Sequence, residues 1–222
     1  MAKKYLRVPE LIVGFDTETT GLDVASERAI SYGFCAYRYG TPEWSEQFYV
    51  LPDRPIAPAA KRVHGLSVED IEAKRDRHTV LSVQSGLVRA VEILRRYQQQ
   101  GASIVGANVV RFDLEMLRRS YESVFGKSLA DEYFDLSLLS IIDVVEHDLA
   151  IDPSREDRPR RGLSYLCKYY GVAPGGHDAL GDARATVEVF IEQVIRNNAG
   201  QMPLHLEFPL LGSNSSVEVT KP

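Results

Sequence analysis

The sequence predicts an α/β fold with a mixed sheet flanked by helices, and two features lead to this expectation. Apolar and aromatic residues alternate along residues 28–39 and again along 44–50, which is typical of an antiparallel hairpin. Beyond the hairpin, short apolar runs alternate with segments of helical periodicity, as in a sheet with helices packed on it. A chain of 222 residues can form one domain with a sizeable core.

The first buried strand is indicated by the uncharged run from Leu11 to Phe15, which ends in Asp16 and Glu18. Residues two apart on a strand point to the same face, so both carboxylates are expected to project together. Such a pair repels unless a cation lies between its members, which favours a divalent metal ion. Taken alone, an Asp-x-Glu pair is more often the start of a solvated turn, and other segments must decide between the two interpretations.

Two further strands, four longer helices and one short helix are expected in the rest of the chain. Residues 103–107 and 140–143 are apolar enough for buried strands, which with the strand at residue 11 and the hairpin makes five. Helical spacing is found at 79–97, 113–124, 163–170 and 179–194, and Ser67 is placed to cap a short helix.

Three more chemistry-bearing residues lie at the ends of these elements. Asp113 follows the strand at 103–107 and opens a helix, which places its carboxylate at the end of the sheet. His177 follows two glycines at the entrance of the last helix, and Asp182 lies one turn into it. Four acids and one histidine are therefore expected at one edge of the sheet.

Composition restricts the function classes. A net charge of −5 argues against a protein that coats long nucleic acid, but not against an enzyme that grips a chain end. Cys35 and Cys167 lack metal-ligand spacing and are expected to be reduced core thiols. No apolar run is long enough for a signal peptide or a membrane span, so we expect a cytoplasmic protein without a membrane partner.

The acid-bearing segments, in this order, resemble the DnaQ-like 3′-to-5′ exonuclease family, specifically its DEDDh group of proofreading subunits and RNase T. Three stretches carry the resemblance, which spans residues 11–197: Asp16-Thr17-Glu18-Thr19-Thr20-Gly21, Asn108 to Asp113, and His177 to Ala183. Two positions depart from the family pattern. Ala107 stands where members often have His, and Arg111 is bulkier than the small residue expected, which leaves substrate preference open.

The resemblance implies a ribonuclease H-like fold with a mixed five-stranded sheet in an exonuclease domain, which we expect over residues 1–200. Residues 201–222 have no periodicity, so we expect a partly disordered tail there. Two metal ions can stabilise the attacking and leaving oxygens of phosphodiester hydrolysis, and oxygen ligands favour Mg²⁺, with Mn²⁺ as a substitute. The expected ligands are Asp16, Glu18, Asp113 and Asp182. His177 is the expected general base that deprotonates the attacking water.

The resemblance also implies where the terminal nucleotide binds. The expected contacts are Thr17, Thr19, His64, Leu66 and Asn108. We expect release of nucleoside 5′-monophosphates from the 3′ end of single-stranded DNA. The alternatives are an exoribonuclease, which differs in tolerating a 2′-hydroxyl, and a catalytically silent nucleic-acid-binding or polymerase-docking module, against which the complete set of acids and His177 counts.

Two segments raise questions of partners. Residues 201–208 place Leu204, Leu206 and Phe208 after a glutamine, which resembles peptides that dock on a sliding clamp or a replicative polymerase, although packing on this protein's own surface is the more common fate of such a segment. Residues 151–162 form a charged loop with four arginines that is either a solvated connection or a phosphate-facing patch.

Overall fold

The computed structural model describes residues 6–152 and 162–199. The strands of this part are β1 (Leu11–Thr19), β2 (Ala29–Arg38), β3 (Thr41–Val50), β4 (Thr79–Leu81), β5 (Ser103–Gly106) and β6 (Ser140–Asp143). The helices are α1 (Pro58–His64), α2 (Val68–Glu72), α3 (Val83–Gln99), α4 (Asp113–Phe125), α5 (Leu129–Glu132), α6 (Val144–Ile151), α7 (Leu163–Tyr170) and α8 (Ala179–Asn198), with 3₁₀ turns at Ala73–Asp76 and Leu136–Leu138.

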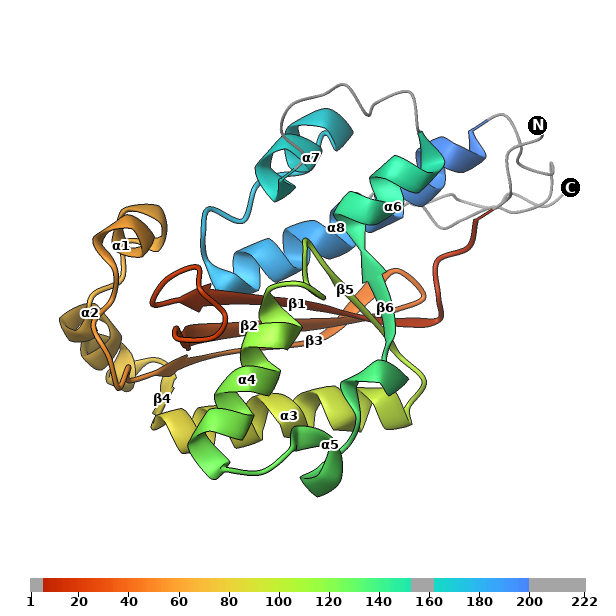
Figure 1. Cartoon of the computed structure of the whole chain (residues 1–222). Coiled ribbons are helices and arrows are strands. Elements are labelled where there is room, and N and C mark those ends of the chain that lie inside the picture. The colour runs from red at the N-terminus through yellow and green to blue at the C-terminus, as the bar shows by residue number, and fades with distance from the viewer. Residues whose placement is uncertain (1–5, 153–161, 200–222) are drawn as a thin grey trace, which may run out of the picture.

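The strands form one mixed sheet in the order β4-β3-β2-β1-β5-β6. β1, β2 and β3 are an antiparallel meander, whereas β5 pairs parallel to β1, and β6 pairs parallel to β5. Helices cover both faces, with α3 and α4 on one side and α6, α7 and α8 on the other (Figure 1). The predicted α/β class, the hairpin and the parallel strands after it are confirmed.

The expectation of five strands was wrong, because the sheet has six. Thr79–Leu81, which helical periodicity assigned to a helix, is β4, paired parallel to Phe48–Val50. The helix starts only at Val83, where the Ser82 side chain accepts a hydrogen bond from the backbone N–H of Ser85. Val80 stands three residues before Val83, so its spacing matched the helix although its backbone is extended.

Alternation along β1 divides the core into two layers. Val13 and Phe15 lie in the cluster covered by α3 and α4, where Phe15 stacks on Phe34 at 4.8 Å between ring centroids. Ile12 packs on the opposite face, in the cluster of α6, α7 and α8. The same alternation places Asp16 on the α8 face and Thr17 on the α4 face.

Helix α8 lies almost directly on the backbones of β1 and β2. A Cβ added at Gly33 would stand 2.1 Å from the carbonyl carbon of Ala179, and one added at Gly14 would stand 2.3 Å from the carbonyl oxygen of Ala183. Real side chains do not tolerate such distances. Glycine at both strand positions therefore sets how closely the first turns of α8 approach the sheet.

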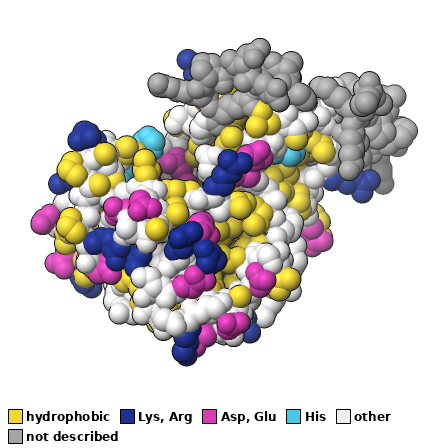
Figure 2. Space-filling model, in the orientation of Figure 1, with side chains coloured by type: hydrophobic (Ala, Val, Ile, Leu, Met, Phe, Trp, Pro, Cys, Tyr) yellow, Lys and Arg dark blue, Asp and Glu magenta, His cyan; other side chains and the backbone are white. Residues whose placement is uncertain are grey.

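The face that Figure 2 shows carries charged side chains of both signs. Acidic and basic side chains are interspersed there around a band of hydrophobic side chains, without a continuous basic surface. Cys35 and Cys167 are free and buried, as expected, and burial raises the pKa of the Cys35 thiol to about 12. Among the described residues, no helix is both long and apolar enough to cross a membrane. The expectations for the arginine-containing loop at 153–161 and for the tail at 201–222 fall outside the described residues.

We predict that Gly33→Ala lowers the melting temperature by several degrees, since overpacking against a backbone costs about 1–3 kcal/mol and about 1 kcal/mol shifts a domain of this size by about 2–4 °C. Thermal unfolding followed by circular dichroism measures the change. Gly162→Ala is the control, because a Cβ there meets no atom within 4 Å. Equal melting temperatures of the two variants would show that α8 adjusts freely.

Candidate active site

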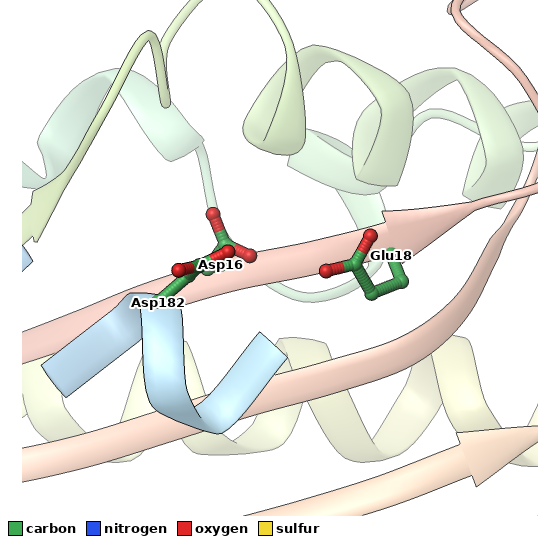
Figure 3. A group of neighbouring side chains, drawn as sticks. All are labelled: Asp16, Glu18 and Asp182. Carbon is green, nitrogen blue, oxygen red and sulfur yellow. The ribbon is translucent and has the colours of Figure 1, made fainter. Parts of the chain in front are cut away.

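Three carboxylates converge at the carboxyl end of β1. Asp16 and Glu18 project from β1, and Asp182 reaches them from the first turn of α8 (Figure 3). One oxygen of each side chain lies within 4.8 Å of the others. The same-face arrangement that the sequence predicted for Asp16 and Glu18 is present, and Asp182 completes an oxygen donor set that suits a hard divalent cation.

Asp113 lies beside this group but on the α4 side of the sheet. It opens α4, only 3% of it is exposed, and its Oδ1 accepts a hydrogen bond of 2.6 Å from the Thr17 hydroxyl. After burial, the charge of Asp113 is the largest cause of the raised pKa of Asp16, so the two carboxylates are close enough to interact. The acids of the expected ligand set therefore meet from three elements, β1, α4 and α8.

The electrostatics of the site call for a cation. Burial, followed by the charges of Asp113, Asp182 and Glu18, raises the pKa of Asp16 well above its usual range. Burial and the charge of Asp182 raise the pKa of Glu18 to about 8. Burial also raises the pKa of Asp182, and it raises that of Asp113 to about 7 against the hydrogen bonds from Thr17. A divalent ion between these oxygens would favour the charged forms, so the residues fit the metal ions that the sequence predicted.

His177 lies at the entrance of α8, as expected. Its backbone has φ = 58°, and it follows Gly176 with φ = 80°, so the chain makes a left-handed turn immediately before the helix. Its Nδ1 lies 4.0 Å from Oδ2 of Asp182, and 54% of its side chain is exposed. The imidazole is therefore next to the acids and open to solvent and ligands.

Asp178 is a neighbouring acid that sequence reasoning missed. It caps α8, with Oδ2 accepting from the N–H of Gly181 at 3.1 Å, and Oδ1 accepting from Nε2 of Gln47 at 2.6 Å. Both carboxylate oxygens of Asp178 thus accept hydrogen bonds within the protein. Asp178 therefore stabilises the start of α8 and is not counted with Asp16, Glu18 and Asp182 as a metal ligand. An Asp immediately before the last predicted helix was the available signal.

The predicted nucleotide contacts are not all equally accessible. The Thr17 and Thr19 side chains are buried, and the Thr19 hydroxyl donates to the carbonyl oxygen of Gly21 at 2.8 Å. Only their backbone can meet a ligand. Asn108 is exposed and has φ = 59°, and its N–H donates to Oδ1 of Asp143 at 3.1 Å.

His64 ties the loop after α1 to the end of β1. Its Nδ1 accepts from the N–H of Leu66 at 3.0 Å, so its Nε2, 3.2 Å from the carbonyl oxygen of Thr19, carries the proton and donates. Burial lowers the pKa of His64, consistent with a neutral ring. Leu66 packs against the small cluster of Ile30, Tyr49 and Ile71.

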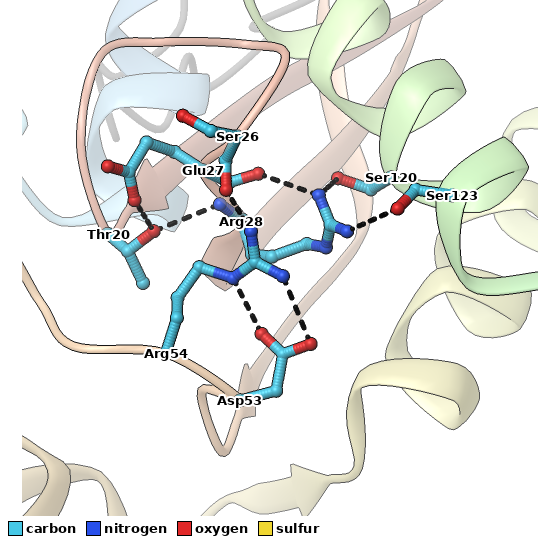
Figure 4. Close-up of polar contacts among 8 residues, drawn as sticks. All are labelled: Thr20, Ser26, Glu27, Arg28, Asp53, Arg54, Ser120 and Ser123. Carbon is cyan, nitrogen blue, oxygen red and sulfur yellow. Dashed lines mark hydrogen bonds and ion pairs between the residues drawn. The ribbon is translucent and has the colours of Figure 1, made fainter.

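A buried arginine holds the loop between β1 and β2 against α4 (Figure 4). Arg28 is 4% exposed and donates to the hydroxyl of Ser123 at 2.9 Å and to that of Ser120 at 3.5 Å. Arg54 makes a bidentate ion pair with Asp53 beside these contacts. This network joins the segment after Glu18 to the helix that carries Asp113.

The two departures from the family pattern lie at the surface or in packing. Ala107 packs beside the cluster under α6 and α8. Arg111 is 81% exposed in its side chain and pairs with Glu146 at 3.0 Å, an arrangement of little energetic weight. Among the described residues, Arg111 is paired with Glu146 and not with the carboxylates at the end of β1.

Comparisons with known proteins agree with this geometry. DNA polymerase III of the PolC type from Thermotoga petrophila and from Thermotoga maritima are each 27% identical over 183 residues, which cover 82% of this chain and 12% of theirs. Crystal structures of E. coli exonuclease I superpose with a TM-score of 0.67, both the complex with a dT13 oligonucleotide (20% identity) and the zinc-bound complex with single-stranded DNA (21%). They match 87% of this chain and 42% of their own.

The chain thus spans about an eighth of the polymerases and under half of exonuclease I. The structural likeness, at about one residue in five identical, establishes the ribonuclease H-like arrangement of sheet and helices. The RNase T family model, which describes exonucleases, matches residues 13–190. Because that match covers more than half of the 222 residues, the chain belongs to the RNase T family of exonucleases.

Proposed function

We propose that this chain removes nucleoside 5′-monophosphates from the 3′ end of single-stranded DNA with the help of two divalent metal ions. The observation that carries the proposal is the convergence of Asp16, Glu18 and Asp182, whose side chains each place one oxygen within 4.8 Å of the others. Burial and neighbouring negative charge raise the pKa values of Asp16 and Glu18, as expected for a site that binds a cation. The oligonucleotides in the exonuclease I complexes support single-stranded DNA as the substrate.

Asp16 is the natural shared ligand, because the charges of both Asp113 and Asp182 raise its pKa and both carboxylates are therefore close to it. Glu18 and Asp182 would complete the shell of one ion, and Asp113 would hold the second. Carboxylate oxygens favour Mg²⁺, for which Mn²⁺ can substitute. When bound, the two ions would stabilise the negative charge that develops on the attacking and leaving oxygens.

His177 acts as the general base. Its imidazole takes a proton from the attacking water, the water oxygen bonds to phosphorus, and the bond between phosphorus and O3′ of the preceding nucleotide breaks. The O3′ that leaves takes up a proton from solvent, so the products are a 5′-monophosphate and a strand with a new 3′-hydroxyl. The exposed position of His177 on a glycine-containing turn allows it to approach once the substrate is bound.

The terminal nucleotide is proposed to lie against the backbone of Thr17 to Thr19, the loop of His64 and Leu66, and Asn108. The polymerase relatives favour a role in proofreading or end maturation. A replicative polymerase or a sliding clamp remains the proposed partner through residues 201–208. The free, buried cysteines support a reducing compartment such as the cytoplasm.

The direct test is digestion of 5′-labelled DNA and RNA oligonucleotides of matched sequence. We expect stepwise shortening of the DNA from its 3′ end with Mg²⁺ or Mn²⁺ and none with EDTA. Asp16→Ala and Asp182→Ala should each reduce the rate at least about 10³-fold, because metal ions contribute several kcal/mol of charge stabilisation. Glu188→Ala, at an exposed position on the same helix as Asp182, is the control.

Preferential shortening of the RNA would replace DNA by RNA as the substrate. Binding of oligonucleotides without any shortening would favour the silent binding module. Loss of activity in Glu188→Ala alongside the acid variants would mean that disturbance of α8, rather than loss of a ligand, is being measured.

We predict that His177→Ala lowers kcat by about 10²–10⁴-fold, the usual contribution of general-base catalysis. The variant should retain its KM for the oligonucleotide and its affinity for Mn²⁺, because His177 is not among the expected ligands. Steady-state kinetics and Mn²⁺ titration measure these quantities, with His78→Ala as the control for loss of an exposed histidine. A raised KM with unchanged kcat would assign His177 to substrate positioning instead.

Metal-free protein should lose stability as the pH rises. The folded-state pKa of Glu18 is raised from 4.5 to about 8 and that of Asp113 from 3.8 to about 7, so the folded state favours their neutral forms. Their stabilising contribution is complete below pH 4 and is lost as the pH rises through about 7 and 8. Melting temperatures in EDTA should therefore fall between pH 5 and pH 8.5.

Saturating Mg²⁺ should remove most of this slope, and at pH 8 it should raise the melting temperature by about 5–10 °C, as expected for a ligand at about 100 times its Kd. Glu18→Gln should flatten the slope in EDTA, whereas Glu188→Gln should not. Parallel curves with and without Mg²⁺ would contradict the proposed metal site.

A further inference from the structure

A hydrogen bond between two side chains joins β1 and α4, the elements that carry Asp16 and Asp113. The Thr17 hydroxyl on β1 donates to Oδ1 of Asp113 on α4 at 2.6 Å. The exposed fractions of the two residues are 7% and 3%, so water does not compete for this contact. Ninety-six positions separate them in the chain, and the bond forms only when α4 is docked on the sheet.

The sheet leaves this side of Thr17 free. β5 pairs with β1 only from Ile12 to Gly14, and β1 continues to Thr19 without that neighbour. The chain leaving β5 turns at Gly106, where an added Cβ would lie 2.9 Å from the carbonyl oxygen of Phe15, and then enters α4. The chain that leaves β5 therefore passes close to β1 before it enters α4 with Asp113.

The bond also fixes the orientation of the Asp113 carboxylate. Each carboxylate oxygen can accept two hydrogen bonds or ligate a metal ion. The Thr17 hydroxyl holds Oδ1, and the backbone N–H groups of Thr17 and Asp113 also bond to this carboxylate, so its rotation beside Asp16 is restricted. The negative charge of the nearby Asp143 would otherwise disfavour a fixed, charged Asp113.

We propose that Thr17 is a positioning residue for the metal site, whose hydroxyl orients the Asp113 carboxylate toward the second metal ion. This inference rests on the proposed function, since it assigns Thr17 a role in the same site. It adds a role of the Thr17 side chain to the backbone contact with the nucleotide that the sequence leads us to expect, because the hydroxyl bonds to Asp113 inside the protein. Residues that support a metal ligand typically contribute about 10–100-fold to metal affinity.

The test compares Thr17→Val, Thr17→Ala and Thr17→Ser in the full chain without substrate. Mn²⁺ binding is followed by isothermal titration, and thermal unfolding is measured in EDTA. Val and Ala remove the hydroxyl, and we expect each to weaken the second Mn²⁺ site about 10–100-fold. Ser restores the hydroxyl and should restore the affinity to within about threefold, and KM for the oligonucleotide should stay unchanged at saturating metal.

Thr186→Val is the matched control, because Thr186 is also buried but its hydroxyl donates to the carbonyl oxygen of Ala183 at 2.8 Å. It should lower the melting temperature without changing Mn²⁺ affinity. Should Thr17→Val fail to fold, the Ala and Ser pair, which differ only in the hydroxyl, still decides the question.

A lowered melting temperature of the Val and Ala variants with Mn²⁺ affinity within about twofold of the unchanged chain would overturn the inference, and Thr17 would be a link between β1 and α4 only. Equal affinities of the Ala and Ser variants would overturn it as well. The absence of any Mn²⁺ binding by the unchanged chain would instead reject the proposed function, and the inference with it. These outcomes are distinct, because the first two require a working metal site.

Discussion

Mutual repulsion among buried carboxylates is the constraint on which the arrangement of this protein depends. Asp16, Glu18, Asp113 and Asp182 come from three elements, and burial disfavours the charged form of each. Such a group is stable only if the surrounding packing holds it together or a cation offsets its charge. The apolar clusters on both faces of the sheet supply the first requirement, and the oxygen donor set is suited to the second.

Two features of the scaffold keep these charges in place. Gly14 and Gly33 let α8 approach the sheet closely enough for Asp182 to reach Asp16. On the other face, the Thr17 hydroxyl and the network of Arg28 with Ser120 and Ser123 fix α4 against the end of β1. Each support is neutral or positive, so it adds no further negative charge beside the acids.

The sequence was a good guide wherever the signal is local. The period of two along β1 predicted that Asp16 and Glu18 share a face, and the break at Gly175 and Gly176 predicted the place of His177. It failed at β4, where three extended residues carried a helical spacing, and it gave no sign that Gln47 holds Asp178 or that Thr17 holds Asp113. These contacts join residues 131 and 96 positions apart, and no periodicity along the chain records them.

The position of α8 also has a consequence for the order in which the chain becomes active. Asp16 and Glu18 lie on the first strand, β1, whereas Asp182 lies on the last helix described, α8, with His177 just before it. This helix packs across β1 and β2. During synthesis the N-terminal strands leave the ribosome first. A nascent chain can therefore assemble the strand, Asp113 and most of the sheet before His177 and Asp182 join them. The three-carboxylate group can therefore form only after α8 has docked across β1 and β2.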